Sequence, residues 1–242
     1  MKRNLLLNAK IFRTHLLIVA IVASVFHVTA QTAVQQGVYA PDGIMDLMET
    51  VNRNWMLNGK NEQIEGSPYL KEEFEPGEIQ LKDNTTIPEV PMRYNIYNDQ
   101  IEFQYKEKTY NIGNKNLVEN IKIGTDVFIV EMYETINGER FGFFSLLADG
   151  ETRLLAKYEM ELTDKVPAKA LRDPEPRKFV RENDVYYVKI GQQRIYAFGN
   201  VKKLIAYLGD HEEELEAFAK KEKISARNPD ELAKLINYYN SL

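Results

Sequence analysis

The sequence predicts an α+β protein in which a largely antiparallel β-meander sheet, curled or two-layered, has C-terminal helices packed against it. Between about residues 78 and 197, short runs of alternating apolar and polar residues are separated by turn residues, a pattern typical of successive hairpins. From about residue 200 the apolar residues instead recur at helical spacing. The chain has no cysteine, so no disulfide holds the fold, and its 44% hydrophobic residues must supply the core.

The first thirty residues have the order of a secretory signal peptide. Four basic side chains and no acidic one accompany an apolar run over 16–26, and small residues around Ala30 provide a cleavage site. An uncleaved anchor helix is the alternative, but the apolar run is shorter than the roughly 20 residues that span a bilayer. We therefore expect cleavage after Ala30, no membrane anchor afterwards, and a periplasmic or secreted protein.

The processed chain would carry 27 basic and 36 acidic side chains, a formal charge of −9. This acidic balance argues against nucleic acid as a partner. We expect three segments after this reading: the signal peptide over 1–30, a lead-in with a short helix over 31–65, and a β-rich domain over 66–242 whose helices begin near residue 200.

The lead-in contains one pattern that predicts a helix. Asp42 is a possible N-cap, and a helical face follows it. The apolar residues of that face are Ile44, Leu47, Met48 and Val51. The segment 58–61, Asn-Gly-Lys-Asn, is expected to end this helix.

The first group of strands begins near residue 90. Alternation over 90–96 predicts a half-buried strand. Asn98-Asp99 predicts a turn into a second strand over 101–105, and Lys106-Glu107 a turn into a third strand over 109–112.

The second group is richer in β-branched and aromatic residues. Asp126–Ile136 predicts a strand that is apolar on both faces and therefore covered on both sides. Asn137-Gly138 predicts a type I′ hairpin turn, because both residues tolerate positive φ. Arg140–Leu147 returns, Ala148-Asp149-Gly150 turns again, and Thr152–Leu162 is expected to form one long strand.

Prolines and charges over 163–177 predict a surface loop, and strand patterns resume over 178–181, 185–190 and 194–198. Three helices are expected to follow. Their predicted N-caps are Asn200, Asp210 and Asn228, and the last is followed by Pro229 at the first helical position and by Glu231, which completes a capping box.

The inventory of reactive groups is small. After processing, His211 is the single histidine, which excludes a histidine-rich metal site and favours a surface role for that residue. The chain has no Gly-x-Ser-x-Gly elbow and no phosphate-binding glycine loop. Acidic pairs such as Glu72-Glu73 and Asp149/Glu151 are expected to be solvated surface groups. We therefore expect no catalytic residue, no metal and no cofactor.

Two segments and the chain end carry a resemblance. They are Gly66–Ile79 with its Gly-x-Pro-Tyr-Leu entry, the Arg93-Tyr94-Asn95 run within 90–97, and Leu235–Asn240. In these motifs the chain resembles uncharacterised exported β-rich proteins of Bacteroidota. The resemblance implies an exported β-rich protein and brings no activity or catalytic residue with it.

Arg93, Asn95 and Tyr97 are the candidate ligand-binding residues. Arg93 and Asn95 lie on the strand face opposite Met92 and Tyr94, where they would bind an anion or a sugar. The competing interpretation, which we favour, is that they satisfy backbone groups or a neighbouring carboxylate.

These observations favour a non-enzymatic exported envelope protein that binds a protein partner or a surface ligand such as a glycan. One alternative is a glycan-acting enzyme that uses two carboxylates, which requires two facing carboxyls with at least one buried. The other is a carrier of an apolar ligand inside a curled sheet, which requires a continuous apolar cavity of several hundred Å³.

Overall fold

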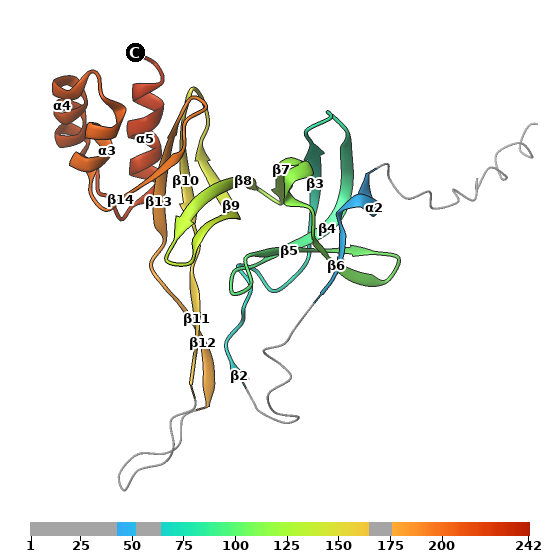
Figure 1. Cartoon of the computed structure of the whole chain (residues 1–242). Helices are drawn as coiled ribbons and strands as arrows, with labels where there is room; N and C mark the ends of the chain where they lie inside the picture. Colours follow the sequence, from blue (N-terminus) through green and yellow to red (C-terminus); the bar gives the residue numbers. More distant parts are fainter. Residues whose placement is uncertain (1–42, 52–63, 165–175) are drawn as a thin grey trace, which may run out of the picture. The chain divides into compact units, whose positions relative to one another are not determined.

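The computed structural model describes residues 43–51, 64–164 and 176–242, drawn in colour in Figure 1. Most strands in these segments form one sheet with the order β1-β6-β5-β4-β3-β7-β8-β9-β10-β13-β14. These eleven strands are β1 (Met48–Thr50), β3 (Glu75–Leu81), β4 (Thr86–Asn95), β5 (Gln100–Tyr105), β6 (Lys108–Ile112), β7 (Val118–Ile123), β8 (Asp126–Thr135), β9 (Gly138–Ala148), β10 (Thr152–Lys157), β13 (Val185–Ile190) and β14 (Ile195–Phe198).

Every neighbouring pair in this sheet is antiparallel, and the sheet does not close on itself. The chain runs from β3 through β4 and β5 to β6 on one side, and the short 3₁₀ helix η2 (Lys115–Leu117) leads back to β7 on the other side of β3. From β7 to β10 the strands again follow chain order. The predicted antiparallel meander is confirmed.

A second sheet has three strands, in the order β11 (Met160–Thr163), β12 (Arg177–Arg181) and β2 (Ile64–Glu65). Its existence corrects the prediction of one long strand over Thr152–Leu162. Residues up to Lys157 pair with β9 and β13, whereas residues from Met160 pair with β12. The alternation of apolar residues continues across this break because alternation reports which face is buried and carries no information on the partner strand.

The predicted helix in the lead-in is wrong in its second half. Helix α2 covers only Ile44–Leu47, and Met48–Thr50 continues as strand β1 beside β6. Ile44 and Leu47 are buried, so the apolar spacing did identify core residues. Pairing with the β6 edge, with Met48 opposite Ile112, replaces further helical turns. The predicted cap Asp42 lies outside the described residues.

The predicted hairpin turns at Asn137-Gly138 and at Lys106-Glu107 are both present. The type I′ geometry, expected at Asn137-Gly138, occurs instead at Lys106-Glu107. Between β8 and β9 the loop residues are Ile136 and Asn137, and neither has positive φ, whereas Gly138 has φ 100° at the start of β9. A type I′ loop requires positive φ at both loop residues. Lys106 and Glu107, between β5 and β6, have φ 48° and 63° and meet this requirement.

The C-terminal helices α3 (Val201–Leu208), α4 (Glu212–Glu222) and α5 (Pro229–Tyr239) pack against the sheet, as predicted. In Figure 1 they lie beside β10, β13 and β14. Helix residues Leu204, Leu215, Leu232, Leu235 and Ile236 share one buried cluster with Leu154, Ala156, Val188 and Phe198 of the strands.

The other face of the same strands is also filled. Leu155 follows Leu154 in β10 and points to the opposite face, where it joins a separate cluster with Ile129 and Ile195. The rings of Tyr133, Phe144 and Tyr187 pack edge to face in this cluster, with centroids 5.2 to 6.4 Å apart. In β8 the successive residues Phe128 and Ile129 are both buried and point to opposite faces, whereas Met132 is exposed, so the expected covering on both sides holds for only part of the strand.

Two of the three predicted helix caps are confirmed. The side chain of Asn200 accepts from the Lys203 amide, and that of Asn228 accepts from two amides in the first turn of α5. Helix α4 instead begins after His211, which has φ 53° and caps nothing with its side chain. Asp210 therefore does not cap α4.

Several predictions fall on undescribed residues. The export signal over 1–30, the remainder of the lead-in up to residue 42, the helix end at 58–61 and most of the proline-containing loop lie outside the described residues. Among the helices that are described, none has the length and apolar run needed to cross a bilayer.

Candidate functional site

The structure brings two of the three predicted ligand residues onto one buried carboxylate. Arg93 on β4 lies directly opposite Glu102 on β5, and Glu102 is 1% exposed. Arg93 donates to Glu102 Oε2 from Nε and Nη2 at 3.0 and 2.8 Å, and Asn95 donates to Oε1 at 3.3 Å. Tyr97 does not join them, because its ring packs edge to face on Phe179 of β12 at 5.3 Å.

The remaining contacts of Arg93 hold its guanidinium inside the protein. Nη1 donates to the carbonyl of Glu72 at 2.8 Å, and Nη2 donates to the Tyr69 hydroxyl at 2.8 Å. The guanidinium also stacks over the rings of Tyr69 and Phe74, at 3.6 and 4.3 Å from their centroids. Such an arginine satisfies a carboxylate and a backbone carbonyl, which is the interpretation favoured from the sequence.

Contacts around Arg93 also connect two of the sequence motifs, the segment that begins at Gly66 and the Arg93-Tyr94-Asn95 run. The segment that begins at Gly66 lies against the end of β4, where the Leu70 amide donates to Tyr94 O and the Ile96 amide donates to Pro68 O. Tyr69 brings its hydroxyl to Glu102 from this segment. The motif residues therefore build a structural junction.

A second ionic group, which we call the Asp99 cluster, lies at the turn after β4. Lys157 of β10 donates to Asp99 Oδ1 at 2.5 Å, and Lys115 donates to the Asp99 carbonyl at 2.9 Å. The Tyr94 hydroxyl and the Phe143 amide donate to the same carboxylate oxygen, at 2.8 and 3.2 Å. The Lys115 ammonium also lies 3.4 Å from Asp99 Oδ2, so one carboxylate pairs with two ammonium groups.

Burial controls the acid–base behaviour of the Asp99 cluster. Lys157 is 3% exposed, and desolvation lowers its pKa to about 8 despite the attraction of Asp99. Desolvation also lowers the pKa of Lys115, and it raises the pKa of Tyr94 well above its ordinary value, with the charge of Asp99 adding to that rise. The perturbed groups therefore lie inside the protein, where they join distant strands.

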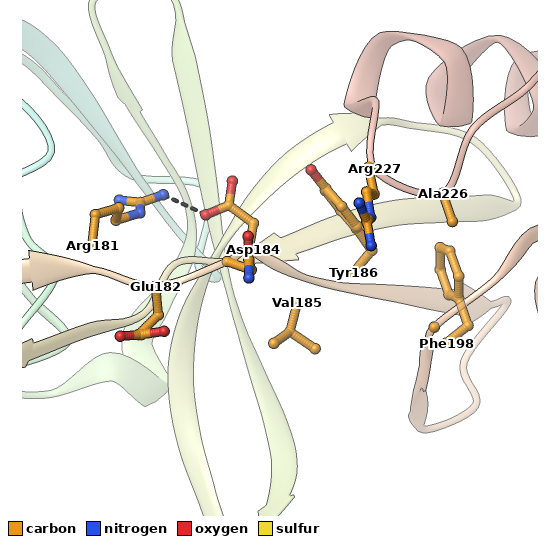
Figure 2. A pocket seen from close by; sticks show the side chains of 10 residues that line it. Arg181, Glu182, Asp184, Val185, Tyr186, Phe198, Ala226 and Arg227 are labelled. Atoms are coloured by element: carbon orange, nitrogen blue, oxygen red, sulfur yellow. Dashed lines mark hydrogen bonds and ion pairs between the residues drawn. The ribbon is translucent and has the colours of Figure 1, made fainter.

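A surface hollow that could receive a ligand lies elsewhere among the described residues. A cleft of about 840 Å³ opens between the β12–β13 turn, the end of β14 and the loop that joins α4 to α5 (Figure 2). We call it the β13 cleft. Its lining includes Arg181, Glu182, Asp184, Tyr186, Phe198 and Arg227.

The floor of the β13 cleft is aromatic, but its ring faces are covered. Tyr186 and Phe198 are 8% and 5% exposed and stack on each other at 6.5 Å. The polar side chains stand around this floor. At one end Arg181 donates to Asp184 at 2.6 Å, while Arg227 lies at the other end beside the α4–α5 loop (Figure 2).

Two charged side chains of the β13 cleft are uncommitted. Within the described residues, neither the Glu182 carboxylate nor the Arg227 guanidinium makes a hydrogen bond or ion pair, and both residues are exposed. Figure 2 shows the Glu182 carboxylate directed away from Asp184. The cleft can therefore offer an acceptor at one end and a donor at the other to a bound polar molecule.

Sequence reasoning did not identify this cleft. Asn183-Asp184 lies between two predicted strands, where such residues indicate only a turn, and Arg227 stands just before the Asn228 cap. The residues come from a turn, a strand end and an interhelical loop, so no spacing in the sequence connects them. Arg181 did show one usable signal, an opposite charge at i+3 across a turn, which is the Arg181–Asp184 pair.

The described residues contain no group of three or more potential metal-ligating side chains. The acidic pairs Glu72-Glu73 and Asp149/Glu151 are exposed. His211 is also exposed, with Nδ1 3.5 Å from a Glu214 carboxylate oxygen.

Comparison of the chain with protein-family models, with curated proteins and with solved structures returns no match. The geometry of the chain itself therefore carries the functional argument.

Proposed function

We propose that the chain is a non-enzymatic exported protein of the cell envelope that binds an extended segment of a partner protein in the β13 cleft. The supporting observation is that this cleft, about 840 Å³ in volume, contains two charged side chains, Glu182 and Arg227, that have no hydrogen-bond or ion-pair partner among the described residues. Charged groups left unpaired on a hollow surface cost little in water and become useful when a ligand supplies the partner.

A protein segment fits this cleft better than a sugar does. Glycan sites commonly present the open face of an aromatic ring for stacking, whereas the rings of Tyr186 and Phe198 are covered by each other and by the protein. The cleft instead presents charged groups at its two ends, with Glu182 and Asp184 at one end and Arg227 at the other (Figure 2). An extended peptide can carry side chains of opposite charge that reach both ends.

The carboxylates of the β13 cleft do not have the arrangement that a glycosidase needs. A two-carboxylate glycosidase requires one carboxyl in an environment that raises its pKa. The carboxylates of the β13 cleft, Glu182 and Asp184, are both accessible to solvent and point apart. No observation therefore favours the enzymatic alternative at this cleft.

The alternative of a carrier for an apolar ligand inside the sheet is disfavoured, because the face of the sheet that would hold the ligand is filled by side chains. The cluster around Tyr133, Phe144 and Tyr187 occupies the space that an apolar ligand would need. An open groove of about 410 Å³ beside Val127 and Leu146 is smaller and is bordered by charged side chains.

Site-directed photo-cross-linking tests the proposal. Asn183→p-benzoylphenylalanine places the photoreactive group at the cleft, and the same group at Lys221 of α4, which is 79% exposed in its side chain, is the control. We expect a cross-linked partner from position 183 only, when the cross-link is made in intact cells.

The purified partner then allows a direct binding measurement. Gly199 lines the cleft, and a Cβ placed there meets nothing within 4 Å, so the position can accept a side chain and Gly199→Trp adds bulk at the cleft. We expect Gly199→Trp to weaken binding at least about tenfold and Lys221→Trp to leave the dissociation constant unchanged. Equal binding by the parent and Gly199→Trp would exclude the cleft.

The export part of the proposal has its own test. The protein should be recovered from the periplasmic or extracellular fraction, and N-terminal sequencing should begin at Gln31. Recovery in the cytosol with Met1 retained would contradict it.

A further inference from the structure

The α4–α5 end of the β13 cleft carries a positively charged side chain, that of Arg227. Arg181, the other arginine of the cleft, already has Asp184 as its partner. Arg227 makes no side-chain hydrogen bond or ion pair within the described residues. This difference between two arginines of one cleft points to Arg227 as the group that awaits an external partner.

The loop that carries Arg227 is braced. The Arg227 amide donates to Ser225 Oγ at 3.3 Å, and the Ser225 amide donates to a Glu231 carboxylate oxygen at 2.7 Å. Asn228, the next residue, caps α5 and donates to Glu231 at 2.9 Å. Because the backbone on both sides is held, binding through Arg227 has a smaller ordering cost than binding through a mobile loop.

A second donor lies at the same end of the cleft. The Tyr186 hydroxyl has no hydrogen-bond partner within the described residues, although the side chain is 92% buried. Figure 2 shows Tyr186 at the side of the cleft where Arg227 lies. A guanidinium and a phenolic hydroxyl together form a donor pair, and the acceptor that matches such a pair best is a carboxylate.

We infer that Arg227 and Tyr186 form a carboxylate-binding subsite, and that the partner segment places an acidic side chain there. This inference rests on the proposed function, since it names the chemistry of the segment that the cleft receives. Glu182 at the opposite end then favours a basic residue farther along the same segment. The partner motif would therefore contain both an acidic and a basic residue.

Titration followed by NMR tests the subsite. The probes are a hexaglutamate peptide, a neutral Gly-Ser hexapeptide and a hexagalacturonate oligosaccharide, each added to the full processed protein. We expect hexaglutamate to shift the side-chain Nε resonance of Arg227 and the neutral peptide to leave it unchanged.

Three variants make the assignment specific. Arg227→Ala should weaken hexaglutamate binding about tenfold, and Arg227→Lys should recover part of that loss because charge remains without the planar fork. Tyr186→Phe should weaken it by a smaller factor. Arg194→Ala removes the same charge from an exposed arginine outside the cleft and should have no effect.

The outcomes separate the possible failures. Equal losses in Arg227→Ala and Arg194→Ala would mean general charge attraction, and the subsite would be wrong. Binding of hexagalacturonate but not of hexaglutamate would overturn the peptide assignment in favour of an acidic glycan. If Arg227→Ala binds the cross-linked partner normally while Gly199→Trp does not, the subsite fails and the proposed function stands.

Discussion

The side-chain amide of Asn240 pairs with the backbone of Thr152 as another peptide group would. Asn240 Oδ1 accepts from the Thr152 amide at 3.0 Å, and Nδ2 donates to the Thr152 carbonyl at 2.8 Å. Strand β9 pairs with β10 only from Leu154 onward, so Thr152 has no backbone partner on that edge. The last turn of the chain thus completes the sheet at its β9–β10 corner.

Asn240→Ala should lower the free energy of unfolding by about 1–3 kcal/mol, because it leaves the buried Thr152 amide without its acceptor. Asn237→Ala, an exposed change in the same helix, should alter it by less than about 0.5 kcal/mol. Urea unfolding of both variants measures the difference. Equal stabilities would show that the pairing contributes nothing net.

Gly138→Val should destabilise the β8–β9 hairpin by about 1–2 kcal/mol, since φ 100° is costly for a β-branched residue. No atom lies within 4 Å of a Cβ at this position, so the effect would come from the backbone alone. Gly199→Val is the matched control, because Gly199 has the same free space without a left-handed φ. A thermal midpoint equal to the parent's would show that the hairpin tolerates the strain.

The fold was predictable where local chemistry decides it. Alternation located β4 and β5 because each has one face against a core, a run of β-branched and aromatic residues located β8, and Asn228-Pro229 located the start of α5 because a helix end needs these groups. Partner choice was not predictable from the same signals. Met48–Thr50 forms β1 beside β6, and the strand predicted over 152–162 divides between two sheets, because both depend on an edge supplied by distant residues.

The candidate site was harder to predict from the sequence than the fold, because its residues depend on contacts between distant parts of the chain. Arg93 and Asn95 were noticed because polar residues in a strand pattern are conspicuous, and they share the buried Glu102. Arg227 and Glu182 occupy ordinary exposed positions, where a charge carries no local signal. What distinguishes them is that neither side chain has a partner in the part of the chain that the structure describes, which the sequence does not reveal.

Arg93→Ala should be strongly destabilising, by about 3–5 kcal/mol, because it leaves the carboxylate of Glu102 buried without its cation. The double change Arg93→Ala with Glu102→Gln should recover part of this loss by removing the charge. Arg153→Ala breaks the exposed pair with Asp149 and should cost less than about 1 kcal/mol.

Partner binding gives this prediction a second readout. If Arg93 is structural, folded Arg93→Ala protein should bind the cross-linked partner with the parent's affinity at a temperature well below its unfolding midpoint. A loss of affinity without a loss of stability would instead indicate that Arg93 takes part in partner binding.

The depressed pKa of Lys157 predicts an unusual pH dependence. Below about pH 8 the ammonium is charged in both folded and unfolded chains, and its burial costs stability. Between about pH 8 and the ordinary lysine pKa of 10.5, the folded protein releases this proton while the unfolded chain keeps it. The unfolded state then binds more protons, so the free energy of unfolding rises with pH, by at most about 1.4 kcal/mol per pH unit.

Lys157→Met removes this titration and leaves Lys115 to pair with the Asp99 carboxylate, whose Oδ2 lies 3.4 Å from its ammonium nitrogen. The free energy of unfolding of the parent, minus that of Lys157→Met, should increase between pH 8 and 10 in urea titrations. A raised tyrosine pKa, such as that of Tyr94, acts in the opposite sense: above the ordinary tyrosine pKa of 10.0 the unfolded chain releases a proton that the folded chain keeps, so stability falls as the pH rises. Measurements between pH 8 and 10 therefore stay below most of this effect. A difference that stays constant over this range would mean that Lys157 keeps an ordinary pKa, and that the attraction of Asp99 fully offsets its burial.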